Sequence, residues 1–194
     1  MKHPKVFCIG MHKTGTTTMG KALQHLGYKV KSSIPLDDPR IKTINAQLKT
    51  QLPLLLSRFD AFEDHPWPFL CEKIDRLCPG SKFILTTRHT ESWWASVEQF
   101  FGTKQTLMRQ WVYGVGHGAP AGNKKAYVTR FEGHNAAVRH YFKSRPSDLL
   151  TIDLSDGNNW EKICGFLKTD IPSVEFPHAH KSANYDKHQR LANA

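Results

Sequence analysis

Short apolar runs separate amphipathic stretches along most of the chain. The run Lys5–Gly10 shows no alternation with polar residues, and Lys82–Thr87 and Leu149–Leu154 repeat the pattern. Apolar runs of this kind are typical of strands covered on both faces in a parallel sheet. A shorter strand is expected at Phe59–Phe62. These runs predict the central sheet of an α/β protein.

The amphipathic stretches predict helices. From Met19, apolar residues recur at i, i+3, i+4 and i+7, and Gly27 follows as a helix stop. Asp38-Pro39 has the form of an N-cap with a first-turn proline, and starts a second helix that Pro53 interrupts. Another helix is expected from Phe69 to Leu77, where Pro79-Gly80 closes it.

Two further helices follow later strands. Thr90 is placed to cap a helix that buries Trp93 and Trp94, and Asn158 or Asn159 is placed to cap the last helix. Between them, the segment of about 102–125 is rich in glycine and weakly periodic, although part of it can be helical. A mobile lid or substrate loop is expected there. Strands alternating with helices predict a three-layer α/β sandwich around a mostly parallel sheet.

The length and composition indicate one globular domain. The 194 residues are 39% hydrophobic and 23% charged, which excludes a disordered chain, a collagen-like fibre and a coiled coil. We expect a single domain over residues 1–194. No apolar stretch approaches the roughly 20 residues that a bilayer requires, and the four scattered cysteines suit a reduced compartment. The sequence therefore predicts a cytoplasmic protein that does not bind membranes.

The chain is strongly basic. Its 27 Lys and Arg against 17 Asp and Glu give a formal net charge of +10, which calls for an anionic partner or a role in solubility. A basic nucleic-acid-binding module would explain the charge. The basic residues are spread along the chain, however, and no zinc-finger, helix-turn-helix or RNP-like motif accompanies them. We therefore expect no nucleic-acid partner.

The loop after the first predicted strand has the composition of an anion site. It reads Gly-Met-His-Lys-Thr-Gly-Thr-Thr-Thr over Gly10–Thr18. Glycine lets the backbone approach an anion closely, and N–H groups at a helix start, together with threonine hydroxyls, can donate to it. The competing interpretation is a glycine turn before a threonine-capped helix. The position of the loop, directly after a buried strand, favours an anion site.

The same loop departs from the Gly-x4-Gly-Lys-Ser/Thr motif of nucleotide triphosphatases. Thr16 stands where that motif has its lysine, and the lysine lies earlier, at Lys13. No aspartate after a later strand is an obvious magnesium partner. A P-loop kinase-like phosphotransferase remains the alternative enzyme, but the displaced lysine argues against it.

A second candidate anion site follows the strand Lys82–Thr87. Arg88 lies just past the end of this strand, and Ser96 follows eight residues later on the next helix. If both face the same crevice, a guanidinium and a hydroxyl could hold one further phosphate group. An arginine taken alone is more often an ordinary surface charge, so the two sites have to be judged together.

These residues resemble those of sulfotransferases that use 3′-phosphoadenosine 5′-phosphosulfate (PAPS). Lys13–Thr18 is similar to their 5′-phosphosulfate loop, and Arg88 with Ser96 resembles their 3′-phosphate motif in type and spacing. The resemblance also includes the stretches Phe59–Asp64, Pro79–Arg88, Trp160–Leu167 and Phe176–His178. It covers most of the chain but not Gly102–Lys125, and it implies a P-loop NTPase-like sulfotransferase fold of the small single-domain kind.

The resemblance implies transfer of a sulfuryl group from PAPS to a hydroxyl or amine of a small-molecule or carbohydrate acceptor, with 3′,5′-bisphosphoadenosine (PAP) as product. The residues it implies for donor binding are His12, Lys13, Thr14, Gly15, Thr16, Thr17, Thr18, Arg88 and Ser96. Lys13 is the first catalytic candidate, because a fixed ammonium would stabilise the charge that develops on the bridging oxygen. A sulfuryl group carries less negative charge than a phosphoryl group, so no metal is expected.

The acceptor must also lose a proton, so a general base is expected near the donor. Asp64 and His65 follow the strand at Phe59–Phe62, and His134 lies in a helix-like segment after the expected lid. Asp64 is the first candidate by its place in the Phe-Glu-Asp stretch, whereas a histidine titrates nearer neutral pH. The sequence leaves the choice among the three open.

The expected lid carries the candidate acceptor residues. Trp111, Tyr113 and His117 suggest an aromatic or sugar-like pocket, and Trp67 is a candidate for stacking on adenine. The sequence pattern assigns no oligomeric state.

Overall fold

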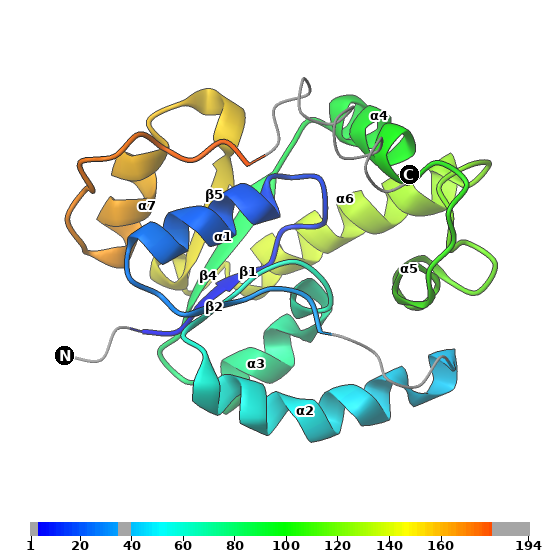
Figure 1. Ribbon diagram of the computed structural model, residues 1–194, viewed down its shortest axis with the longest axis horizontal. Coiled ribbons are helices and arrows are strands. Elements are labelled where there is room, and N and C mark those ends of the chain that lie inside the picture. The colour runs from blue at the N-terminus through cyan, green and yellow to red at the C-terminus, as the bar shows by residue number, and fades with distance from the viewer. Residues whose placement is uncertain (1–3, 35–39, 180–194) are drawn as a thin grey trace, which may run out of the picture.

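The sheet of this protein is parallel throughout. The computed structural model describes residues 4–34 and 40–179. Within them, five strands pair in the order β2-β3-β1-β4-β5, with helices on both faces (Figure 1). The strands are β1 (Val6–Cys8), β2 (Val30–Lys31), β3 (Ala61–Phe62), β4 (Lys82–Thr87) and β5 (Leu149–Asp153). The helices are α1 (Thr16–His25), α2 (Ile44–Arg58), α3 (Cys71–Leu77), α4 (Thr90–Phe101), α5 (Leu107–Tyr113), α6 (Lys124–Tyr141) and α7 (Asn159–Leu167), with short 3-10 turns at Ile41–Thr43, Trp67–Leu70, Pro146–Asp148 and Leu154–Asp156. The predicted three-layer α/β class is confirmed.

The central strand β1 explains the two halves of the core. Successive strand residues point to opposite faces. Val6 and Cys8 face the cluster formed with α1 and α7, whereas Phe7 and Ile9 face the cluster formed with α2, α3 and α6. Figure 1 shows α1 and α7 together on one side of the sheet and α2 and α3 on the other. All four residues are fully buried, as the apolar run predicted.

The start of the chain folds as its pattern predicts. β1 leads through a glycine-containing loop into α1, which buries Met19 and Leu23. Gly27 stops this helix at a φ of 84°, and its N–H donates to the carbonyl of Gln24. The strand-loop-helix unit thus brings the candidate anion loop to the carboxyl end of the central strand.

Strand β2 and the length of α2 were not predicted. β2 has only two residues, Val30–Lys31, both half-buried, and so leaves no apolar run in the sequence. α2 continues through Pro53 to Arg58, so the expected interruption is wrong. Leu52 is buried before the proline and Leu55 packs on the same cluster after it, so packing outweighs the cost of roughly 3 kcal/mol for an interior proline. The expected cap at Asp38-Pro39 lies outside the described residues.

Of the two predicted helix caps, the one at Thr90 is wrong and the one at Asn158 is correct in position but not in side-chain bonding. Thr90 lies inside α4, whose N-cap is His89, and its hydroxyl donates to Glu132 Oε1 over 3.0 Å. Asn158 does occupy the N-cap of α7, but in a left-handed conformation without a side-chain cap bond. The neighbouring Asn159 donates its Nδ2 to the carbonyl of Leu154. The side chains of Thr90 and Asn159 therefore bond to other segments instead of to the first turn of their own helix.

The segment of about 102–125 is partly helical and well packed. It contains α5, whose N-cap Thr106 accepts a hydrogen bond from the Arg109 N–H over 3.2 Å. Val112 and Tyr113 are buried against α4 and α6. The eighteen residues of α6 follow, where the sequence indicated only a helix-like stretch around His134. The expected lid is thus anchored to the fold through α5.

The cysteines are all free. Cys8, Cys71 and Cys164 are buried and Cys78 is half-buried. Along the described chain, no helix combines the length and the apolar character needed to cross a membrane.

Candidate functional site

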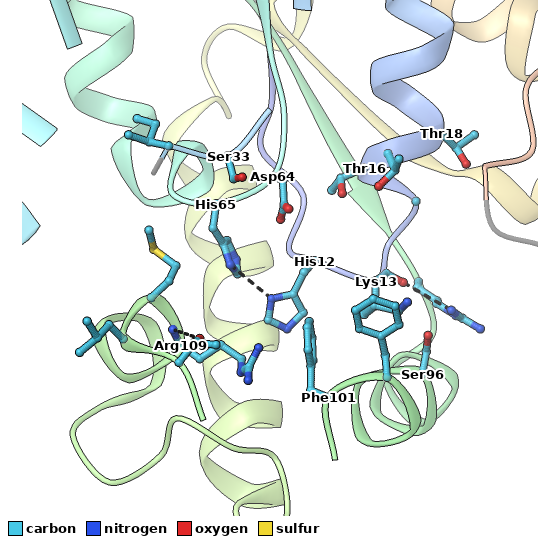
Figure 2. Close-up of a pocket in the computed structure, with 18 residues that line it drawn as sticks. His12, Lys13, Thr16, Thr18, Ser33, Asp64, His65, Ser96, Phe101 and Arg109 are labelled. Atoms are coloured by element: carbon cyan, nitrogen blue, oxygen red, sulfur yellow. Dashed lines mark hydrogen bonds between the residues drawn. The ribbon is translucent and has the colours of Figure 1, made fainter. Parts of the chain in front are cut away.

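A cavity of about 580 Å³ opens at the carboxyl ends of β1, β3 and β4. Its volume is typical of small-molecule sites. The lining residues come from the loop before α1, the segments after β2, β3 and β4, and the stretch around α5: His12, Lys13, Gly15, Thr16, Thr17, Thr18, Ser33, Ile34, Asp64, His65, Arg88, Ser96, Phe100, Phe101, Thr106, Leu107, Met108 and Arg109. Figure 2 shows Lys13, Thr16 and Thr18 to one side of the cavity, Asp64 and His65 to the other, and His12 between them.

The loop crosses β4 at very short range. A Cβ placed on Gly10 would lie 1.9 Å from Thr86 Oγ1 and 2.4 Å from the Thr86 carbonyl oxygen, so only glycine fits. The Thr14 hydroxyl donates to the carbonyl of Met11 over 2.6 Å. Thr86 Oγ1 also lies 2.6 Å from Thr14 Oγ1, and it acts as the donor because the only Thr14 hydroxyl proton is engaged. The Thr14 side chain therefore holds the loop in place and is not available to a ligand.

The N-terminus of α1 is open to an anion. Its N-cap, Gly15, has a φ of 95° and supplies no side-chain bond to the first turn. The N–H groups of the first turn, Thr16 to Thr18, have no acceptor within the helix, and the helix dipole adds partial positive charge there. A Cβ on Gly15 would lie 2.6 Å from Leu154 Cδ1, an atom at the end of a flexible side chain, so it is chiefly the left-handed backbone that favours glycine here.

The three threonine hydroxyls are not equivalent. Thr16 is buried and hydrogen-bonds to the carboxylate of Glu63, which also bonds to Ser32. Thr18 Oγ1 accepts a hydrogen bond from the N–H of Ala179 over 3.2 Å and keeps its own proton for donation. Thr17 is exposed at the cavity. A ligand would therefore meet the hydroxyls of Thr17 and Thr18 and the backbone of Thr16.

Lys13 carries its charge at the edge of the cavity. It has a φ of 64°, and its ammonium lies 3.6 Å from the centroid of the Phe100 ring. Burial lowers the pKa of Lys13, neighbouring Arg88 lowers it further, and Asp64 opposes the shift. The half-buried ammonium is thus directed and partly desolvated, as a charge that stabilises an anion should be.

Arg88 and Ser96 line the same cavity as the loop. Arg88 Nη1 donates to the carbonyl of Lys13 over 3.4 Å, and Nε donates to Ser92 Oγ over 3.3 Å. Arg88 also borders a smaller adjoining cavity of about 370 Å³, together with Asp153 and His178. The structure therefore brings the two sequence motifs together, 75 residues apart in the chain.

Asp64 and His65 follow β3 directly. Asp64 lines the cavity with a φ of 66°. His65 is buried, and its Nδ1 lies 3.3 Å from Nδ1 of His12. His12 Nε2 lies 2.9 Å from the hydroxyl of Tyr113. His65 Nε2 is buried as well and has no hydrogen-bond partner among the described residues.

His134 does not line the main cavity. Its Nε2 donates to the carbonyl of Ile9 over 2.7 Å, and burial lowers the pKa of His134 to about 4. It lines a separate cavity of about 660 Å³ with Tyr113 and His117. None of the three candidate acceptor residues in the expected lid lines the main cavity. Trp111 packs on Phe69, and Tyr113 and His117 line the separate cavity.

Trp67 does not reach a nucleotide. It is fully buried against Phe7 and Phe62, and its Nε1 donates to the carbonyl of Ser32. It is a core residue, and the suggestion that it stacks on adenine is wrong.

Arg109 is a site residue that the sequence pattern did not reveal. It is 6% exposed, donates to the carbonyls of Gly118 and Lys104, and lies 4.3 Å from the ring centroid of Phe101. Within residues 4–34 and 40–179 it has no carboxylate partner. Its segment is weakly periodic, so nothing in the local pattern separates it from a surface arginine.

Comparison with known proteins identifies the class to which this fold and site belong. The model of the sulfotransferase domain family matches residues 5–119 and 102–185, so the chain belongs to this family. Both matched ranges include residues 102–119, where the sequence resemblance had not extended. The all-parallel sheet agrees with a P-loop-like sulfotransferase fold, and family membership supports sulfotransferase activity.

One curated relative can be aligned with nearly the whole chain. Ava biosynthesis cluster protein M of Aspergillus versicolor is 25% identical over 212 residues, which cover 90% of this chain and 80% of the relative.

Proposed function

We propose that this protein transfers a sulfuryl group from PAPS to a hydroxyl or amine of a small-molecule or carbohydrate acceptor. The observation that carries the proposal is the composition of the main cavity. Lys13, the open N-terminus of α1 and Arg88 supply positive charge on one side, and Asp64 supplies a carboxylate on the other. Family membership gives the reaction class.

The residues present fit a nucleotide that carries phosphate at both ends. Lys13 and the N–H groups of Gly15 to Thr18 would hold the 5′-phosphosulfate. Arg88 and Ser96 would hold the 3′-phosphate, and Arg88 has no carboxylate partner in the described part of the chain. The main and the adjoining cavity share Lys13, Gly15, Thr18 and Arg88, so a single ligand could extend across both.

PAPS supplies an activated S–O bond, which breaks as the acceptor oxygen or nitrogen bonds to sulfur, leaving the electron pair on the 5′-phosphate. The chain supplies fixed positive charge for that developing anion. The Lys13 ammonium and the loop N–H groups are already oriented, so they stabilise it without reorganisation.

Asp64 is the side chain best placed to take the acceptor proton. Its carboxylate lines the cavity. His65 Nδ1 is engaged with His12 and its Nε2 is buried, while His134 lines another cavity. The proton of the acceptor would therefore pass to Asp64 as the new bond to sulfur forms.

The remaining wall of the cavity suits the acceptor. Apolar contact comes from Ile34, Phe101, Leu107 and Met108. Polar contact comes from Ser33 and Thr106. This mixture fits a hydroxyl or amine on a largely apolar body.

Calorimetric titration separates this proposal from its alternatives. PAP should bind with one-to-one stoichiometry, whereas ATP with magnesium and a mixed-sequence oligonucleotide should bind far more weakly. Preferential binding of ATP with magnesium would instead indicate a phosphotransferase, and preferential, salt-dependent binding of the oligonucleotide would indicate a nucleic-acid-binding module. An acceptor screen that measures PAP release from PAPS then tests turnover.

A further inference from the structure

The proposed catalytic lysine and the proposed proton acceptor have the same uncommon backbone conformation. Lys13 has a φ of 64° and Asp64 a φ of 66°, both in the left-handed region that L-residues seldom adopt. Such conformations persist where the surrounding structure holds them. Each of the two is adjacent in sequence to a buried histidine: His12 precedes Lys13, and His65 follows Asp64.

These histidines bond to each other across the cavity floor. Their Nδ1 atoms are 3.3 Å apart and their rings meet edge to face, with centroids 4.6 Å apart. A hydrogen bond between two ring nitrogens needs one proton, so one Nδ1 donates and the other accepts. Figure 2 shows the dashed contact that joins the loop after β1 to the segment after β3.

Other elements fix His12 in turn. Its Nε2 pairs with the Tyr113 hydroxyl of α5 over 2.9 Å, and its carbonyl accepts from Trp93 Nε1 of α4 over 2.9 Å. Tyr113 itself stacks on Tyr127 of α6 with ring centroids 3.6 Å apart. The loop that carries Lys13 is therefore held from α4 and α5 as well as from β3.

Neither imidazole is suited to exchange a proton with a ligand. Both His12 nitrogens have partners, His65 Nδ1 is bonded to His12, and His65 Nε2 is buried. What the pair does fix is the separation of the two loops that carry Lys13 and Asp64.

We propose that Tyr113, His12 and His65 are positioning residues that hold the Lys13 ammonium and the Asp64 carboxylate at their working separation across the cavity. This inference rests on the proposed sulfuryl transfer for its catalytic meaning, but the hydrogen-bonded chain can be tested without turnover.

Burial, supported by neighbouring positive charges, keeps the pair neutral. Burial lowers the pKa of both histidines. The charges facing His65 are Asp64, which opposes the shift, and Arg109 and Arg130, which support it. Arg109 and Lys13, together with the ring of His65, act in the same direction on His12.

Two neighbouring groups complete these surroundings. Burial raises the pKa of Tyr113, so its hydroxyl stays protonated, and the pKa of nearby His134 is lowered to about 4. The one-proton bond between His12 and His65 therefore persists below the pH at which an ordinary histidine titrates.

The first experiment compares two replacements of His65. In His65→Asn an amide stands near the position of Nδ1 and can keep the bond to His12, whereas His65→Leu removes it. We expect the leucine variant to lose roughly 100-fold in kcat and the asparagine variant less than about tenfold, with the KM for PAPS changing less in both. His140→Leu, at an exposed position of α6, is the matched control and should retain full turnover. Equal losses in both His65 variants, with disappearance of the acid limb of the pH profile, would show that His65 is the base and overturn the proposal.

The second experiment detects the hydrogen bonds among Tyr113, His12 and His65 directly. In 15N-histidine-labelled protein without ligand, NMR at neutral pH should show one protonated and one bare Nδ1 in the His12–His65 pair. Tyr113→Phe removes the hydroxyl that faces His12 Nε2, and should shift the His12 tautomer and lower kcat several-fold with little change in PAP affinity. Both Nδ1 atoms bare, or both protonated, would contradict the proposed bond even if PAPS turnover is found. Conversely, the expected tautomers without any PAPS turnover would locate the failure in the proposed function.

Discussion

Gly10 and Thr86 lie so close together that no side chain fits between them. A Cβ on Gly10 would be 1.9 Å from Thr86 Oγ1, on the neighbouring strand β4. The candidate donor loop is therefore seated on the sheet itself, and its shape depends on the absence of one methyl group.

Replacing this glycine should unfold or severely weaken the protein. Gly10→Ala should lower the free energy of unfolding by about 3 kcal/mol or more, because both clashing atoms belong to a buried strand residue. The matched control is Gly133→Ala in α6, where an added Cβ meets nothing within 4 Å and should stabilise by about 1 kcal/mol. Urea denaturation of both variants checks this, and a Gly10→Ala variant as stable as the parent would contradict the packing described here.

Removing the charge of Lys13 should slow turnover much more than it weakens donor binding. Lys13→Gln should lower kcat roughly 100- to 1,000-fold, the cost of losing one oriented donor to a developing anion. Lys13→Arg keeps the charge and should recover part of the rate, and Lys104→Gln at an exposed site should have no effect. Steady-state kinetics with PAPS provide the measurement, and undiminished turnover in Lys13→Gln would remove its catalytic role.

Asp64 allows a nearly isosteric test of the proton acceptor. Asparagine adopts the left-handed backbone readily, so Asp64→Asn should preserve the fold at φ 66°. We expect kcat/KM to fall about 100- to 10,000-fold, because the amide cannot accept the acceptor proton. The melting temperature and PAP affinity should stay close to those of the parent. A loss smaller than about tenfold would direct attention to another base.

Arg88 should discriminate between nucleotides with and without a 3′-phosphate. Arg88→Gln should weaken PAP binding about 10- to 100-fold, the usual range for losing a charge-assisted hydrogen bond. Binding of adenosine 5′-phosphate, which lacks the 3′-phosphate, should change only slightly. Arg139→Gln on the exposed face of α6 is the control. An equal loss for both nucleotides would mean that Arg88 contacts a different part of the donor.

Glu63 should make the fold less stable as the pH rises. Burial raises the pKa of Glu63 above the usual 4.5, and one of its carboxylate oxygens, Oε2, has no hydrogen-bond partner in the described structure. The folded state therefore binds this proton more tightly than the unfolded state, and stability falls as the pH increases through the raised pKa. Glu63→Gln should accordingly raise the melting temperature at pH 7, with the gain fading below pH 4.5. Glu98→Gln, at an exposed position of α4, is the control and should leave the melting temperature at pH 7 close to that of the parent.

The parts of the fold that were predicted correctly have local signals. β1, its loop and α1 follow one another within about twenty residues, and their apolar spacing and glycines specify them directly. Strand β4 was also predicted, because burial on both faces gives it a continuous apolar run in the sequence. Strand β2 escaped prediction because two half-buried residues carry no periodicity.

The connections within the site could not be predicted in the same way. His12 and His65 are 53 residues apart, and His12 and Tyr113 are 101 apart. Whether such side chains meet depends on the strand order and on how α5 packs, and neither leaves a pattern near these residues. The sequence could thus name Lys13 and Asp64 as candidates, but the hydrogen bonds that join their neighbours required the structure.

The strand order determines where the two candidate catalytic segments begin. The loop with Lys13 continues from β1 and the segment with Asp64 continues from β3, and these strands are paired partners in register at Phe7 and Phe62. Paired strands run about 4.8 Å apart, a spacing that backbone hydrogen bonds enforce. The segments that carry Lys13 and Asp64 therefore leave the sheet side by side, from two adjacent strands. The pairing of β1 with β3 thus brings the proposed charge-stabilising lysine and the proposed proton acceptor to neighbouring connections, although 51 residues separate them in the sequence.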